Sequence, residues 1–416
     1  MLDALRVKDF RLLWFGRAAS QLGTWLLVVA VPAHVLELTG SVVAAGLTLA
    51  AEFLAPLVLG PVAGVVVDRW DRRRVMVCAD LLRAVAIAAL LFADGPGEVW
   101  LVYLALVVES VGSVAFRPAA QAHTPAVVGT GTLLAGANAV NAATDGTVRL
   151  VGAPLGGVLL ALAGFAPLVW LDVVSYLVSA AAIVATSRRG APGRSGGGLA
   201  DLREGWAFLR RTPIPRALLL VNTVFLGANA TLSSLVVPFG VQVLGGTGET
   251  GVVLSGLGVG FLLGAPATRL LTDRLHPAHL LAGALAVTAA GFGLLFSATS
   301  VPYAVAAAVV VGLAGSTTLV GTQTVLQRAT PNAILGRVGA ALFMGEAAAS
   351  FAGALAGPAL LGISWSAAVW TACGVTLLCA ALALVMLRKA GRTTPPTDTP
   401  TPRPGQQSAP GPSATG

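Results

Sequence analysis

The chain has 416 residues, of which 56% are apolar and only 11% charged, whereas about a quarter of the residues in soluble domains are charged. With a mean hydropathy of +0.83, most of the chain is expected to lie in lipid. A soluble catalytic domain is excluded, because no polar stretch before the C-terminal tail reaches the roughly 50 residues of a small domain. The only lysines, Lys8 and Lys389, lie near the ends, which excludes a P-loop lysine and ATP hydrolysis of the Walker type.

Twelve apolar runs of membrane-spanning length follow one another along the chain. A helix needs about 20 apolar residues to cross the hydrocarbon core, so these runs predict an all-α integral membrane protein. The expected spans are 12–36, 41–67, 75–93, 98–117, 137–162, 166–186, 217–243, 250–272, 277–297, 301–326, 337–362 and 366–387.

Basic residues are concentrated in alternate connections between these spans. The N-terminal segment, every second loop and the C-terminal segment hold 23 of the 26 arginines and lysines. The intervening loops hold no basic residue but contain Glu37, Asp94, Glu98 and Glu249. The positive-inside rule then predicts that both termini are cytoplasmic. A bilayer, and not nucleic acid, therefore accounts for the net charge of +8, and we expect the cytoplasmic membrane of a bacterium.

Landmarks of the first half of the chain recur about 205 residues later. The matched pairs are Asp68-Arg69 with Asp273-Arg274, Pro61 with Pro266, Thr124-Pro125 with Thr330-Pro331, and Pro154 with Pro358. Such a repeat predicts two pseudo-symmetric halves of six helices, with a substrate site between them near the middle of the bilayer. The expected division is an N-terminal half over 1–186, a cytoplasmic linker over 187–216, a C-terminal half over 217–388 and a disordered cytoplasmic tail over 389–416.

The connection between the second and third spans carries a recognisable motif. Its residues are Gly64-x-x-x-Asp68-Arg69-x-x-Arg72-Arg73-Arg74. With this loop the chain resembles the major facilitator superfamily over residues 7–388, which implies a twelve-helix transporter that works by alternating access. Two roles stay open for the loop: a latch that holds one access state, in which Asp68 is the central residue, or a basic anchor that fixes topology. Asp71 departs from the glycine that the family usually has at this position.

Other stretches favour an efflux-type branch of that family. Those that resemble the enterobactin-exporter-like and macrolide-efflux-like branch are Phe10–Arg17, Ser20–Gly23, Asp80–Arg83, Gly136–Ala139 and Pro331 with Gly336-Arg337. In the fifth span, Gly152-Ala-Pro154-Leu-Gly156-Gly157 is similar to the Gly-Pro-x-x-Gly-Gly signature of the family's antiporters, with Ala153 in place of the first glycine. The resemblance implies export in preference to uptake.

Charged residues within the spans are candidate functional groups, because each costs about 2.5–3.5 kcal/mol or more at mid-bilayer. Candidates for the cavity or for ion coupling are Glu52, Glu109, Asp145, Arg149, Asp172 and Glu346. Glu52 and Asp172 fall in the outer half and are expected to line a vestibule. For Glu109, Asp145 and Glu346, proton or cation coupling and plain pairing with Arg149 both stay open.

Sequence spacing also predicts two ion pairs. Asp145 and Arg149 are four residues apart on one helix face and can pair. Asp80 and Arg83, three residues apart, are expected to form a structural pair near the loop that contains Asp68. The family's drug antiporters often carry an arginine in the fourth span, where this chain has Glu109.

These observations predict a secondary active transporter and not an enzyme. We expect export of a small amphipathic or drug-like molecule (an antibiotic, siderophore or metabolite) by proton antiport, from a monomer without cofactor. No metal site is expected, because the three cysteines, Cys78, Cys373 and Cys379, lack metal-like spacing. The alternatives are an importer or facilitator and, in other classes, a membrane-embedded lipid-handling enzyme or a nontransporting sensor.

Overall fold

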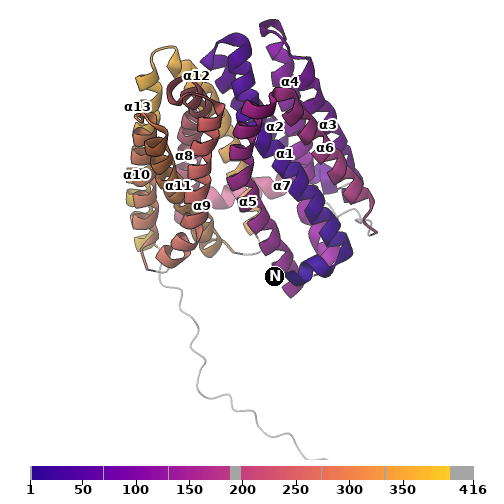
Figure 1. The fold of residues 1–416 in the computed structure, drawn as a ribbon. Helices are drawn as coiled ribbons and strands as arrows, with labels where there is room; N and C mark the ends of the chain where they lie inside the picture. The colour runs from indigo at the N-terminus through magenta and orange to yellow at the C-terminus, as the bar shows by residue number, and fades with distance from the viewer. Residues whose placement is uncertain are drawn as a thin grey trace, which may run out of the picture.

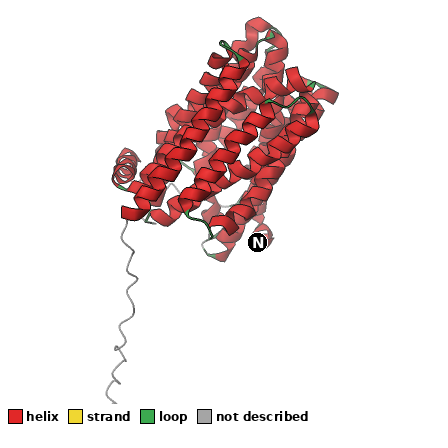
Figure 2. Ribbon diagram, turned by 90° about the vertical axis from the view of Figure 1, so that its left-hand side faces the viewer, coloured by secondary structure: helices red, strands yellow, loops and turns green. Residues whose placement is uncertain are grey.

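The structure, a computed structural model, describes residues 2–68, 70–129, 131–187, 198–272, 274–331 and 334–393. Within these ranges the regular structure is helical, as Figure 2 shows, and no strand is present. Twelve of the described helices are long and apolar enough to cross a membrane. The predicted all-α membrane fold with twelve spans is therefore confirmed.

The first six long helices occupy one side of the bundle in Figure 1. Their bounds are α1 (Lys8–Thr39), α2 (Val42–Asp68), α3 (Arg72–Ala88), α4 (Val99–Val128), α5 (Thr132–Ala163) and α6 (Phe165–Val184). Short 3-10 segments adjoin them at η1 (Leu2–Arg6), η2 (Ala89–Phe92) and η3 (Pro96–Glu98). Gly40 ends α1 in the left-handed conformation, with φ +65°, and its N–H donates to the carbonyl oxygen of Leu36, which is the usual glycine cap of a helix C-terminus.

The other six long helices form the second side of the bundle (Figure 1). Their bounds are α8 (Pro213–Phe239), α9 (Thr247–Thr272), α10 (Pro277–Phe296), α11 (Val301–Ala329), α12 (Leu335–Leu361) and α13 (Trp365–Thr393). The amphipathic α7 (Gly198–Arg211) precedes α8, and a π-helical turn, η4 (Gly240–Leu244), follows α8. In α7, Leu209 is fully buried and Trp206 packs against the core of the second side.

The two sides repeat one packing scheme. In the first, α1 packs on α5 and α6, α3 packs on α4 and α6, and α2 packs on α4. In the second, α8 packs on α12 and α13, α10 packs on α11 and α13, and α9 packs on α11. In this scheme α2 corresponds to α9, and α5 corresponds to α12. The two contacts between the sides, α2 with α12 and α5 with α9, are therefore equivalent. This arrangement confirms two pseudo-symmetric six-helix halves, while the exact division at residues 187–216 stays a prediction.

The two ends of the bundle differ in charge. At one end, called the basic end here, lie the start of α1 and the arginines Arg72, Arg73 and Arg74 at the start of α3. At the opposite, acidic end lie Glu37 near the end of α1 and Glu249 at the start of α9. That the basic end faces the cytoplasm stays a prediction.

Asp71, which stands where the family usually has glycine, caps α3. Its carboxylate accepts hydrogen bonds from the backbone N–H groups of Arg73 at 2.8 Å and Arg74 at 3.3 Å. These are among the N–H groups that a helix leaves without partners in its first turn. The departure from glycine therefore gives this short connection a conventional N-cap.

Replacing Asp71 by alanine is expected to destabilise the protein. The loss should be about 1 kcal/mol, whereas Asp71→Gly should cost only a few tenths of a kcal/mol, because glycine tolerates the N-cap position. Thermal unfolding of the purified variants in detergent measures this difference. An Asp71→Ala variant as stable as the wild type would contradict the capping role.

Candidate functional site

A cavity of about 300 Å³ lies between the two halves. It is lined by α1 and α2 from the first half and by α8 to α11 from the second. Most of the lining is apolar or aromatic, and the polar side chains include Thr48, Asn229 and Ser233. A largely apolar cavity with a few polar groups is the usual form of a small-molecule site, and the place agrees with the site predicted between the halves.

Glu52 of α2 is the only charged residue among the described residues that line this cavity. It lies ten residues beyond Val42, the first residue of α2, and hence roughly 15 Å along the helix, close to the middle of a hydrocarbon core about 30 Å thick. Its backbone carbonyl accepts a hydrogen bond from Ser110 Oγ at 2.6 Å, which joins α2 to α4 at this level. The sequence predicts an outer vestibule for Glu52, and the structure places it in the central cavity.

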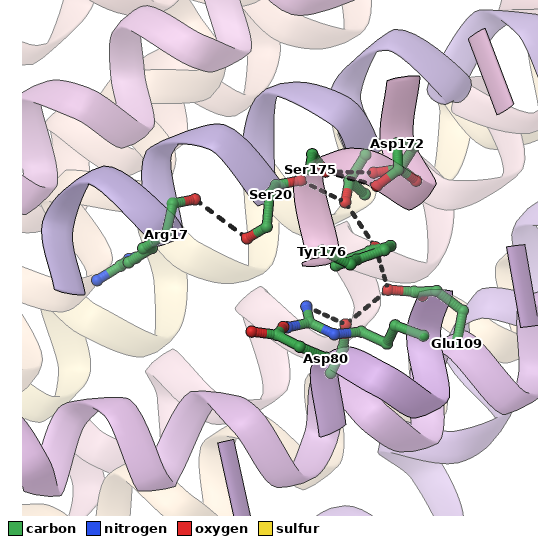
Figure 3. Close-up of polar contacts among 10 residues, drawn as sticks. Arg17, Ser20, Asp80, Glu109, Asp172, Ser175 and Tyr176 are labelled. Atoms are coloured by element: carbon green, nitrogen blue, oxygen red, sulfur yellow. Dashed lines mark hydrogen bonds and ion pairs between the residues drawn. The ribbon is translucent and has the colours of Figure 1, made fainter. Parts of the chain in front are cut away.

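Glu109 of α4 belongs to a separate polar network inside the first half (Figure 3). Its Oε1 accepts hydrogen bonds from Ser113 Oγ at 2.8 Å and from the Tyr176 hydroxyl at 3.0 Å. The Tyr176 hydroxyl is in turn 2.9 Å from Thr24 Oγ1. A carboxylate on α4 is thus connected through α6 to α1. Sequence analysis did not identify Tyr176 or Thr24, because neither is charged and both lie far from Glu109 along the chain.

Asp80 and Arg83 of α3 form a buried ion pair beside this network. Asp80 is fully buried and Arg83 is 5% exposed. The Arg83 guanidinium also lies 4.5 Å from the ring centroids of Phe116 and Tyr176, where cation–π attraction contributes. The aromatic rings and the Asp80 carboxylate together compensate a cation that would otherwise be very costly in lipid.

Asp172 of α6 is fully buried inside the first half. Its carboxylate accepts a hydrogen bond from Ser175 Oγ at 3.1 Å, as Figure 3 shows. It faces α1 at Gly23, where a Cβ atom would overlap the Asp172 carboxylate. Contrary to the expectation of a vestibule residue, Asp172 therefore lies at a helix interface. The side chain of Asp172 lies on the side of α6 that faces α1. The position of a residue along its span predicts its depth in the bilayer but not the side of the helix on which it lies.

Asp145 of α5 pairs with Arg17 of α1. The distance between Asp145 Oδ2 and Arg17 Nη2 is 2.8 Å, and both side chains are partly exposed. The sequence predicts Arg149 as the partner, but the side chain of Arg149 lies outside the described residues. The sequence shows an arginine, Arg17, within the first span, but its pairing with Asp145 was not predicted because the two residues are 128 apart along the chain.

Glu346 of α12 lies in the second half, away from the cavity lining. Its carboxylate accepts a hydrogen bond from the Asn222 side chain of α8. The structure therefore separates the candidate carboxylates. Glu52 lines the cavity, Glu109 and Asp172 are within the first half, Asp145 pairs with α1, and Glu346 is within the second half.

The arginines of the motif between α2 and α3 bind within the first half. Arg72 Nη1 donates to the carbonyl oxygen of Ala122 at 3.0 Å, and Arg73 Nε donates to that of Ile183 at 3.1 Å. Ile183 is in the last turn of α6, whose free carbonyls favour a nearby cation. Arg74 is exposed. The side chains of the other motif residues, Gly64, Asp68 and Arg69, lie outside the described residues, so the latch stays a prediction.

The halves approach closely near the acidic end. A Cβ atom on Gly157 of α5 would lie 2.6 Å from the carbonyl oxygen of Thr247 of α9, and one on Gly46 of α2 would lie 2.7 Å from Pro358 Cγ of α12. Real Cβ atoms do not come this close to other atoms, so both contacts require glycine. Small residues of this kind allow close helix packing in membranes.

The rest of the antiporter-like segment of α5 packs on α1. A Cβ atom on Gly152 would lie 2.5 Å from Trp25 Cβ, and one on Gly156 would overlap the backbone of Leu26. Trp25 also lines the cavity, so the segment contacts a residue of the cavity wall. The side chain of Pro154 lies outside the described residues.

Comparison with known proteins identifies the family. The family model described as Major Facilitator Superfamily matches residues 13–280 and 246–414. The chain belongs to the major facilitator superfamily. The twelve described helices that are long and apolar enough to cross a membrane agree with this family, and the family predicted from the α2–α3 motif is confirmed.

Relatives of this superfamily member carry names of efflux proteins. It is 32% identical over 267 residues to the multidrug efflux pump Tap of Mycolicibacterium fortuitum, covering 61% of this chain and 65% of the relative. It is 28% identical over 232 residues to macrolide efflux protein A of Streptococcus pyogenes, covering 54% of this chain and 57% of the relative. The match thus spans less than two thirds of the length of each. These relatives confirm the predicted resemblance to macrolide-efflux proteins.

Solved transporter structures share the fold. The crystal structure of a mutant of the peptide transporter POT in complex with alafosfalin matches with a TM-score of 0.73 at 13% identity, over 92% of this chain and 95% of that one. At this identity the likeness concerns the fold alone. It agrees with the packing of two six-helix halves described above.

Proposed function

We propose that this transporter exports small amphipathic or drug-like molecules, with protons moving in the opposite direction. The observation that carries the proposal is the cavity between the halves, whose lining is largely apolar and, among the described residues, contains a single charged one, Glu52. A cavity of this composition suits partly apolar cargo better than a sugar, which would need a dense set of hydrogen-bonding groups.

Export is favoured over import by two features. The relatives named above are an efflux protein and an efflux pump. The segment from Gly152 to Gly157 resembles the antiporter signature, and its glycines lie at the contacts of α5 with α1 and α9. We further propose that the basic end faces the cytoplasm, in agreement with the positive-inside rule, and that the transporter works as a monomer in the bacterial cytoplasmic membrane.

Proton coupling is assigned to the network around Glu109. A carboxylate within the membrane is a functional group by default, because keeping it there is costly. The carboxyl group of Glu109 has two hydroxyl partners, Ser113 on α4 and Tyr176 on α6. A hydroxyl group can donate to an ionised carboxylate and can accept from a protonated one, so Glu109 would keep hydrogen-bonding partners in both protonation states. The Arg83 guanidinium lies 4.5 Å from the centroid of the Tyr176 ring and so places a positive charge beside this network.

Cells that express the transporter test the proposal. Cells with the protein should tolerate at least one class of toxic amphipathic compound better than cells without it and accumulate less of that compound. An uncoupler that collapses the proton gradient should remove the difference, because the gradient drives the export. Equal accumulation with and without the protein across a broad panel would contradict the proposed function.

A further inference from the structure

The described part of the cavity wall has one carboxylate and no countercharge. Among the described lining residues Glu52 is charged, and no arginine, lysine or histidine is present. In the part of the chain that the structure describes, the Glu52 carboxylate has no hydrogen bond or ion pair. Its neighbour Ser110 donates instead to the Glu52 backbone carbonyl. An unpaired carboxylate in an apolar site is costly unless it is protonated or a cation lies beside it.

We propose that the cavity selects amphipathic monocations and that the Glu52 carboxylate is their counter-ion. This inference rests on the proposed export function and narrows its cargo to one charge class. A monocation would supply the positive charge that the described lining lacks, while the apolar body of the same molecule would cover the remaining wall.

Aromatic side chains from the second half support binding of a cation. Phe225 of α8 and Phe292 of α10, both from the second half, line the same cavity as Glu52 of the first half. Aromatic rings attract cations through their quadrupole, and this attraction strengthens when water is excluded. Asn229 and Ser233 of α8 also line the cavity and offer neutral hydrogen-bonding groups. Binding would therefore use both halves, as alternating access requires.

The same lining disfavours other charge classes. An anion would meet the negative charge of Glu52 and, among the described lining residues, no cationic side chain. A dication would leave one of its charges uncompensated in an apolar environment, which is costly. The expected order of affinity is monocation, then neutral molecule, then anion. Of the cargoes predicted from sequence, an anionic siderophore is therefore disfavoured.

Glu52 and Glu109 have separate hydrogen-bonding surroundings although they come from adjacent helices. Ser110, which binds the Glu52 backbone, is next to Glu109 in α4, but the Glu109 carboxylate is engaged by Ser113 and Tyr176. Glu52 lines the cavity and Glu109 does not. The two carboxylates do interact through their charges, but of the two Glu52 is the one that lines the cavity. A substitution at Glu52 can therefore be tested by binding alone, without a proton gradient.

Equilibrium binding to the purified full-length chain in lipid nanodiscs tests this inference. The probes are tetraphenylphosphonium, a permanent monocation, and triphenylphosphine oxide, a neutral molecule of related shape. Glu52→Gln should weaken binding of the cation at least about tenfold, because a nearby charge interaction in a site of low dielectric constant is lost. Binding of the neutral probe should stay unchanged. Glu52→Asp should retain preference for the cation, and Glu37→Gln, which removes an exposed carboxylate at the acidic end, should behave as the wild type.

Two results would overturn the inference. One is cation binding by Glu52→Gln equal to that of the wild type, and the other is an equal loss for both probes, which would indicate a structural role. These results leave the proposed export function standing, since export of neutral compounds could continue. Conversely, selective loss of cation binding in a protein that exports no compound would support the inference and contradict the export function.

Discussion

Replacing Glu109 by glutamine should abolish gradient-driven export, reducing it to the level of membranes without the transporter. The amide has the size of the carboxyl group but cannot bind and release a proton. It can still hydrogen-bond with Ser113 and Tyr176, the two partners of the Glu109 carboxylate, so the helix packing of the first half should survive. Exchange of substrate across the membrane without a gradient should therefore continue.

Everted membrane vesicles measure both processes in this Glu109→Gln variant. Uptake of a fluorescent substrate is followed after the proton gradient is formed, and exchange is followed without it. Glu37→Gln is the matched control, because it removes a carboxylate that is exposed at the acidic end. Full gradient-dependent uptake in Glu109→Gln vesicles would show that Glu109 does not couple protons to export.

Removing one partner of the Asp80–Arg83 pair should cause the largest loss of stability. Both residues are buried, and breaking a buried ion pair by a single substitution costs about 3–5 kcal/mol, because it leaves an uncompensated charge. We expect this loss for Arg83→Met, which keeps an unbranched side chain at this position but removes the guanidinium that lies over the rings of Phe116 and Tyr176. The transporter should then unfold at a markedly lower temperature in detergent.

A double-substitution cycle separates the charge from the packing. The variant with Asp80→Leu and Arg83→Met contains neither charge, and replacing both members of a buried pair by apolar residues is often nearly neutral. It should be more stable than either single variant. Additive losses in the double variant would mean that each side chain contributes through separate contacts and not through the ion pair.

Much of the fold follows from local properties of the sequence. The run expected at 301–326 corresponds to α11 (Val301–Ala329), and that at 277–297 corresponds to α10 (Pro277–Phe296). These agree because the length and hydropathy of a span are encoded within the span itself. In α7, Trp206 and Leu209 are three residues apart, a spacing that places two residues on one face of a helix.

The partners of the polar side chains could not be read in the same way. Depth in the bilayer follows from counting residues, but the direction of a side chain around its helix depends on how the helices pack. Asp145 binds Arg17 across 128 residues, and Glu109 binds Tyr176 across 67. Glu52 lines the cavity because α2 faces the second half at that level, whereas Asp172 faces α1 within the first half. Neither direction can be deduced from one span alone.

Transport by the purified protein in proteoliposomes tests proton-driven export most directly. A pH gradient is imposed across the membrane, and movement of a cationic fluorescent substrate is recorded together with the internal pH. We expect the substrate to accumulate against its own gradient only while the pH gradient lasts, with protons moving in the opposite direction. Substrate movement that only dissipates its own gradient and does not respond to the pH gradient would contradict proton antiport.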